Sequence, residues 1–208
     1  MGKLILPRRK LLIGGAASLI CAPSIVRAAC SLPLCGAGPS APGAAVSTTT
    51  WNPADCNANL TLSGGNRIAT MNNAVNNFYS VRSIASHSTG KYYYEITCNT
   101  LTNPSGTTVG FANSTWPLTD FGGQDNNSVG WYGLGNLFPG GPSIATYTTG
   151  SLLGVAIDFG NQKFWGRLNG GLWNLSGTDD PATNTGGFSF ASLNAGPYFA
   201  GITLGHCV

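Results

Sequence analysis

Hydrophobic and polar side chains alternate with a period of two along residues 91–98, KYYYEITC. One row of this segment is apolar in body and consists of Tyr92, Tyr94, Ile96 and Cys98. A period of two is typical of a β-strand with one buried face. We therefore expect the apolar row to face a core, and we expect Glu95, the only glutamate of the chain, to point away from it.

The same alternation recurs around residues 60–62, 153–159, 164–168 and 198–202. Turn signals separate these segments, namely a two-residue hairpin turn at Gly64-Gly65 and further turns at Gly160-Asn161 and Asn169-Gly170. After residue 28 no segment shows the 3.6-residue apolar spacing of an amphipathic helix. The pattern predicts an all-β fold with two packed antiparallel sheets, a β-sandwich.

One predicted strand carries unusually small residues on its second face. Leu153, Val155, Ile157 and Phe159 form its apolar row, whereas Gly154 and Ala156 lie between them. Small side chains let another layer approach closely, so we expect close cover over this second face.

Composition agrees with an all-β domain and limits its partners. The chain has 30 glycines and only 8% charged residues, which is typical of a sandwich with many turns. Five of the ten basic residues lie within residues 1–28, so the remainder has five basic groups against seven acidic ones and a net charge of −2. A domain of this charge lacks the basic surface that binds nucleic acid or anionic membranes.

Residues 1–28 have the layout of an export signal. A basic segment with Arg8-Arg9 precedes an apolar run, and Val26-Arg27-Ala28 offers a small-residue cleavage site. The arginine pair resembles a twin-arginine signal, although Pro7 replaces the usual Ser or Thr. We expect a signal helix outside the fold and an exported protein, periplasmic or extracellular. The alternative is an uncleaved anchor, which would be the chain's one contact with a membrane.

Residues 29–50 are rich in Pro, Gly, Ala, Ser and Thr and carry no charge, so they are predicted to be a linker before a domain at 51–208. Beyond the signal, five cysteines remain: Cys30, Cys35, Cys56, Cys98 and Cys207. An exported protein can form disulfides. Cys30–Cys35 is one possible pair and the other three offer one more, with the choice left open and one thiol left over.

Four sequence blocks in order resemble the SPRY domain family (B30.2/SPRY). They are Val81-Arg82 with 88–96 (STGKYYYEI), 109–112 (VGFA), 122–132 (GGQDNNSVGWY) and 149–170, the last of which contains G-x-x-x-G-V-x-x-D and ends in Asn-Gly. The resemblance implies a two-sheet sandwich related to concanavalin-like jelly rolls, and a non-catalytic module that binds a partner through loops. The signal and the opening WNPAD resemble bacterial or phage members.

Two departures from the family pattern matter. Gly150-Ser151 replaces the family's Gly-Asp, and the chain stops at Val208, where family members usually add another strand. Either another segment finishes this edge or the chain is truncated, and an unfinished sheet would leave an open edge that invites pairing with another chain.

Catalytic chemistry finds little support in the residue types. Glycosidases use two carboxyl groups about 5–10 Å apart, and the strand of Glu95 holds no second acid. His87 and His206 lack a Gly-x-Ser-x-Gly nucleophile, and no Cys-x-x-Cys suggests zinc. We expect no catalytic residue, no cofactor and no metal.

Aromatic residues beside amides are better candidates for binding, because ring faces with nearby amides suit sugars or peptide side chains. They lie in two predicted loops, 113–128 and 171–187, and in the strand that follows the first. The candidates are Trp116, Asp120, Asp125, Asn126, Asn127, Trp131 and Trp173. Core packing is the alternative for Trp131 and Trp173. The leading hypothesis is recognition of a protein or glycan partner, of undetermined oligomeric state. A structural virion or cell-surface component and a carbohydrate-active enzyme are the alternatives.

Overall fold

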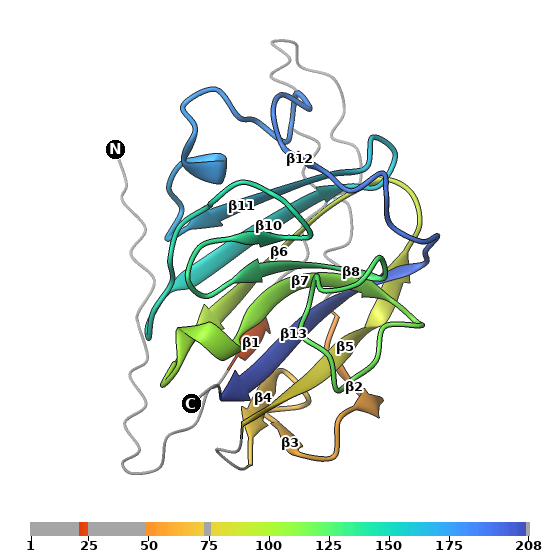
Figure 1. The fold of residues 1–208 in the computed structure, drawn as a ribbon, viewed down its shortest axis with the longest axis vertical. Helices are drawn as coiled ribbons and strands as arrows, with labels where there is room; N and C mark the ends of the chain where they lie inside the picture. The colour runs from red at the N-terminus through yellow and green to blue at the C-terminus, as the bar shows by residue number, and fades with distance from the viewer. Residues whose placement is uncertain (1–20, 25–48, 73–75, 207–208) are drawn as a thin grey trace, which may run out of the picture.

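The computed structural model of the chain describes residues 21–24, 49–72 and 76–206 (Figure 1). These residues form two antiparallel sheets, with seven strands in sheet A and six in sheet B. Across sheet A the order is β12 (Phe188–Ser189), β11 (Lys163–Leu168), β10 (Leu152–Asp158), β6 (Lys91–Cys98), β1 (Cys21–Ser24), β4 (Ile68–Met71) and β3 (Leu60–Ser63). Across sheet B it is β2 (Trp51–Cys56), β5 (Asn77–His87), β13 (Tyr198–His206), β7 (Thr108–Asn113), β8 (Ser128–Tyr132) and β9 (Leu137–Phe138).

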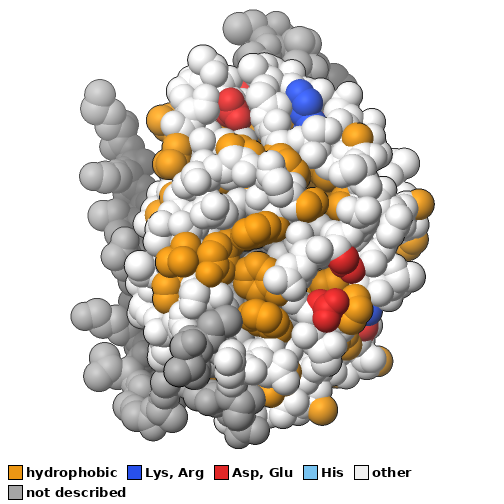
Figure 2. Space-filling model, viewed as in Figure 1, with side chains coloured by type: hydrophobic (Ala, Val, Ile, Leu, Met, Phe, Trp, Pro, Cys, Tyr) orange, Lys and Arg blue, Asp and Glu red, His pale blue; other side chains and the backbone are white. Residues whose placement is uncertain are grey.

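Helical structure in the described part of the chain is limited to two short 3-10 turns, η1 (Pro104–Gly106) and η2 (Trp173–Leu175). No described helix has the length and apolar character needed to cross a membrane. The prediction of an all-β sandwich is therefore confirmed. The side of the molecule seen in Figure 2 carries few charged side chains.

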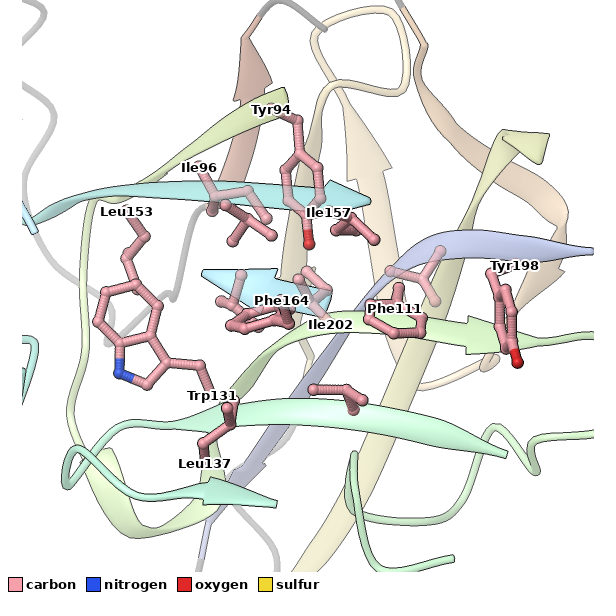
Figure 3. Packing of buried hydrophobic residues seen from close by; sticks show 14 of the residues in the cluster. Tyr94, Ile96, Phe111, Trp131, Leu137, Leu153, Ile157, Phe164, Tyr198 and Ile202 are labelled. Carbon is pink, nitrogen blue, oxygen red and sulfur yellow. The ribbon is translucent and has the colours of Figure 1, made fainter. Parts of the chain in front are cut away.

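The core lies between the sheets and is built by the predicted rows. Tyr94 and Ile96 of β6 and Leu153 of β10 point toward sheet B, which contributes Phe111, Trp131 and Ile202 to the same core (Figure 3). The hydroxyl of Tyr94 crosses the core to donate a hydrogen bond to the carbonyl of Gly110, and burial raises its pKa. Because alternation decides which face is buried, Glu95 points away from this core, as expected.

A buried arginine fastens three segments at the end of sheet B. Arg82 of β5 donates from Nε and Nη2 to the two carboxylate oxygens of Asp55, at 2.6 and 2.7 Å. Its Nη1 donates to the carbonyls of Asn113 and Trp116, at 3.2 and 2.5 Å. The bidentate geometry is the strongest form of such a pair. Arg82 therefore ties β2 and the loop after β7 to β5.

One local prediction is wrong in detail. Ser63 pairs with Ile68, so the β3–β4 turn contains four residues rather than two. Gly64, Gly65 and Asn66 all have positive φ, and three successive left-handed residues need a longer loop than a two-residue hairpin. The last strand, β13, lies between β5 and β7 and is paired on both sides.

The segment Cys21–Ser24 corrects the expected helix outside the fold. These four residues are a strand, β1, inserted between β6 and β4. The twin-arginine segment, the cleavage site and residues 29–48 lie outside the described residues.

The described cysteines narrow the disulfide alternatives. Cys56 on β2 is a free thiol, so the Cys56–Cys98 alternative is not formed. Burial, with a smaller effect of the Asp55 charge, raises the pKa of the Cys56 thiol to about 11. A thiol of this pKa stays protonated and unreactive at neutral pH. Cys30, Cys35 and Cys207 lie outside the described residues.

Candidate functional site

Strand register arranges the outward side chains of β6, β10 and β11 in three rows across sheet A. Tyr93 pairs with Ala156, which pairs with Trp165. The next row on one side joins Glu95, Gly154 and Arg167, and the row on the other side joins Lys91, Asp158 and Lys163. Sheet register therefore brings together residues that lie up to 74 positions apart in the chain.

The central strand contributes almost no side chain to the first two of these rows. Gly154 and Ala156 leave a trough between larger residues on β6 and β11, and Ala156 is itself buried. A Cβ added at Gly154 would lie 2.8 Å from the hydroxyl oxygen of Tyr93 and 3.0 Å from Cγ of Arg167. The expected cover by another layer is not found here: side chains of the neighbouring strands in the same sheet close over Gly154, and a pocket lies over Ala156.

At Ala156 this trough forms the floor of a pocket with a volume of about 520 Å³. Its walls come from β6, β11 and the loop 171–187, which is the blue segment between β11 and β12 in Figure 1. Its lining includes Tyr93, Glu95, Arg167, Trp173, Lys91 and Asp158. We call it the sheet A pocket.

A chain of hydrogen bonds crosses the pocket floor. Arg167 Nη2 donates to the Tyr93 hydroxyl at 2.8 Å, and this hydroxyl donates to Glu95 Oε1. The guanidinium carbon of Arg167 also lies 4.5 Å from the ring centre of Trp173, within the range of a cation–π contact. Burial raises the pKa of Tyr93, as does its bond to Glu95, and Arg167 partly offsets both. Tyr93 thus remains a neutral donor that holds an acidic and a basic group side by side.

The loop 171–187 is held against the sheet by one carboxylate. Asp179 Oδ2 accepts from Asn174 Nδ2 at 2.8 Å and from the Gly187 amide at 3.1 Å. Asn174 Oδ1 in turn accepts from the amide of Gly166 on β11, at 2.9 Å. Burial alone would raise the pKa of Asp179, but these bonds, with smaller contributions from Ser176 and Lys163, lower it. Asp179 therefore fixes the position of the third pocket wall.

Side chains of the flanking strands hold the same loop from its other end. Trp165 Nε1 donates to the Thr185 carbonyl at 3.0 Å, and Lys91 Nζ donates to the Pro181 carbonyl at 2.9 Å. Lys91 Nζ also lies 3.6 Å from Asp158 Oδ2. Burial would raise the pKa of Asp158, but bonds from Asn161 and the Lys91 charge lower it. Lys91 thus holds the loop through the Pro181 carbonyl and also stabilises the Asp158 carboxylate.

Replacing Asp179 with alanine should loosen this wall. The change leaves the Gly187 amide and Asn174 without their charged acceptor, which should cost about 1.5–3 kcal/mol of unfolding free energy in urea at pH 7. Because the folded-state pKa is lowered, the carboxylate stabilises fully above the ordinary aspartate pKa. The stability difference from Asp179→Asn should therefore shrink as pH falls below about 4. An equal difference at pH 7 and pH 3 would contradict this role.

The segment around Trp173 carries exposed apolar side chains on a strained backbone. Its two leucines, Leu172 and Leu175, adjoin a pocket residue in sequence without lining the pocket themselves, and we call them the leucine rim. Leu172 and Leu175 are 59% and 61% exposed, on either side of the half-buried Trp173. Asn174 and Leu175 both have positive φ, 48° and 58°. A left-handed conformation costs a residue such as leucine roughly 1–2 kcal/mol, and such strain clusters at binding sites.

Two of the predicted binding tryptophans are inaccessible, which corrects their assignment. Trp116 is 2% exposed and Trp131 is 0% exposed. The Trp116 ring lies against Gly201 of β13, where an added Cβ would be 3.3 Å from Cζ3. Trp131 is a core residue that donates from Nε1 to the Ala145 carbonyl at 2.9 Å. Of the three predicted tryptophans, Trp173 alone lines the pocket.

The other predicted residues build the 113–128 loop, none of which lines the sheet A pocket. Asp125 accepts from the Asn127 amide and side chain, at 3.0 and 2.7 Å. The Asn127 side-chain oxygen accepts from Asn194 at 2.8 Å. Asp120 offers its carbonyl to the Ser80 hydroxyl at 3.0 Å, and Asn126 offers its carbonyl to the Asn194 amide at 2.7 Å. Except for the exposed Asn126 side chain, the contacts of these residues hold the loop together and attach it to Ser80 of β5 and to Asn194.

Two of the three acids that line the pocket, Glu95 and Asp158, are poorly spaced for glycoside hydrolysis. Glu95 and Asp158 occupy registers four residues apart on paired strands, roughly 13 Å along the strand direction. Glycosidases place their carboxyl groups within about 10 Å. Among the described residues, no group of three or more His, Cys, Asp and Glu lies close enough to hold a metal ion.

Sequence reasoning missed Arg167 as a site residue and left Tyr93 and Glu95 outside the predicted set. The available signal was the outward face of 152–158, where Gly154 and Ala156 pointed to close cover. This signal did not identify the site, because no local sequence pattern indicates that β10 lies between β6 and β11 in the sheet.

Comparison with known proteins shows the fold. No protein-family model and no curated protein sequence matches the chain. The crystal structure of the SPRY domain of human HERC1 matches 76% of this chain and 91% of its own, with 16% identity and a TM-score of 0.59. A crystal structure of a human SPRY domain matches 71% and 89%, with 13% identity and a TM-score of 0.53. The chain therefore has a SPRY-like β-sandwich fold.

Proposed function

We propose that this chain is an exported, non-catalytic binding module that recognises a protein partner through the sheet A pocket and its leucine rim. The fold is that of SPRY domains, and its resemblance to that family implies partner binding. Export rests on the signal-like sequence of residues 1–28. The observation that carries the proposal is the rim, where two leucines stay about 60% exposed beside a pocket tryptophan.

The leucine rim favours a protein over a glycan. Sugar rings bind to flat aromatic faces and to polar groups, and aliphatic side chains add little to such a site. Leu172 and Leu175 suit an apolar side chain of a polypeptide. Arg167 and Glu95 on the floor offer a donor and an acceptor to polar groups of that same segment. An interface with an apolar centre and a few fixed polar groups is typical of protein recognition.

Selection of a random peptide library on the folded protein tests this proposal, with a glycan array as the second arm. We expect peptides to be enriched and the array to stay silent. Leu175→Gly should weaken the selected peptides at least tenfold, because it removes a rim side chain. The same change should leave the melting temperature unchanged or raise it, since glycine adopts positive φ without strain.

Ile84→Ser is the matched control, because Ile84 is a similarly exposed apolar residue, at 56%, on β5 of sheet B. It should leave peptide affinity unchanged. Binding to glycans alone would reject the protein preference. Equal loss in Leu175→Gly and Ile84→Ser would show that the site is misplaced.

A further inference from the structure

Strand β1 joins two parts of sheet A that share no other direct pairing among the described residues. It pairs with β6 over Cys21–Ser24, and it pairs with β4 at Cys21 opposite Ala69. β4 otherwise pairs with β3, and β6 otherwise pairs with β10. Residues 21–24 therefore close a position between β4 and β6, which we call the strand slot (Figure 1).

The strand slot has the width of one strand. Neighbouring strands lie about 4.8 Å apart, so β4 and β6 are about 10 Å apart with β1 between them. That separation is too large for direct hydrogen bonds between β4 and β6. Without β1, the edge of β6 from Glu95 to Cys98 would lose its partners on one side. Such an edge readily accepts another extended segment.

The position of Pro23 agrees with this arrangement. Proline lacks an amide hydrogen and is tolerated in a sheet where the strand has a free side. From Ala22 to Ser24, β1 pairs with β6 alone.

The occupant of the slot lies inside the expected export signal. Residues 21–24 precede the small-residue site at Val26-Arg27-Ala28, so cutting there would separate β1 from the rest of the sandwich. We propose that the strand slot is a strand-acceptor site that the chain fills with its own leader residues 21–24. Cleavage after Ala28 then leaves the leader bound in the slot as a separate peptide, until it dissociates and exposes the edges of β4 and β6.

The slot also borders the sheet A pocket. Ser24 pairs with Glu95, whose side chain lies on the pocket floor. Release of the leader therefore frees the backbone edge of a strand that carries two pocket residues, Tyr93 and Glu95.

Hydrogen exchange on the full chain tests the slot without any partner. Ala22→Pro places two prolines in succession in β1 and removes the amide of a residue that pairs with Thr97. Exchange of the β6 amides that face β1, within 95–98, should speed up at least tenfold. Ala44→Pro, the same change in the linker, should leave these rates unchanged. Unchanged exchange in Ala22→Pro would overturn the proposal.

A cut chain gives a second measurement. A protease site placed within residues 29–48 of the full chain should yield two fragments that elute together in size-exclusion chromatography. After separation in urea and refolding, a peptide spanning residues 19–27 should restore slow exchange in β6. The same peptide with proline at positions 22 and 24 should not. Separation of the fragments on cutting, with no change in β6 exchange, would show that the slot does not need this strand.

Discussion

Replacing Arg82 with methionine should destabilise the sandwich by about 3 kcal/mol, which corresponds to roughly 6–12 °C in melting temperature. The change removes the hydrogen-bond donor of the Asp55 carboxylate and of two carbonyls, those of Asn113 and Trp116. The value lies at the lower end of the range for buried pairs because the Asp55 side chain is 24% exposed. Urea unfolding monitored by tryptophan fluorescence measures it.

Asp55→Asn is the matched control for the pair. It removes the charge but leaves Arg82 its two carbonyl partners, so its cost should be smaller. In the double variant Arg82→Met/Asp55→Asn the asparagine should add little, because the two residues act through one contact. A loss of less than about 1 kcal/mol of unfolding free energy in Arg82→Met would contradict this prediction, because it is the contribution of an ordinary surface ion pair.

Trp116→Ala and Trp173→Ala should have opposite effects. Trp116 is 2% exposed, so its removal should cost about 3–5 kcal/mol of unfolding free energy. Trp173→Ala should change stability far less and weaken a selected peptide about 30-fold or more, as expected for a central aromatic contact. Melting temperature and peptide affinity, measured on both variants, separate the two roles. Lost affinity with full stability in Trp116→Ala would restore it as a binding residue.

The sandwich could be predicted because its signal is local. Tyr94 and Ile96, and likewise Leu153 and Val155, alternate with outward residues, and a period of two decides which face is buried whatever the neighbouring strands are. The turn after β3 could not be predicted in detail. Its length depends on which residues pair, here Ser63 with Ile68, and composition alone leaves that open.

The candidate site was only partly predictable. Trp173 was found from its loop, but its partners Tyr93 and Arg167 come from β6 and β11, and only sheet register brings them together. Trp116 was wrongly assigned to the binding site for a related reason, because the residue that it packs against is distant in sequence. Its polar sequence neighbours suggested a surface loop, whereas Gly201, far along the chain, leaves the space that its ring fills.

The leader strand was missed because a signal-like composition and a strand can occupy the same residues. The pattern of basic and apolar residues indicates how a segment is targeted. Whether that segment also pairs as a strand depends on whether a sheet elsewhere in the chain has a gap between two strands. Here that gap lies between β4 and β6, strands more than 40 residues downstream.

The sheet A pocket divides its walls between two kinds of structure. Tyr93 and Arg167 stand on strands whose other faces carry the core, so substitutions there alter folding and recognition together. The third wall is the loop 171–187, which Asn174 and Asp179 fasten to the sheet. Substitutions at exposed positions of the loop such as Leu172 and Leu175 change the surface offered to a partner without touching these contacts. New binding preferences can therefore arise in this loop while the two-layer framework beneath it stays the same.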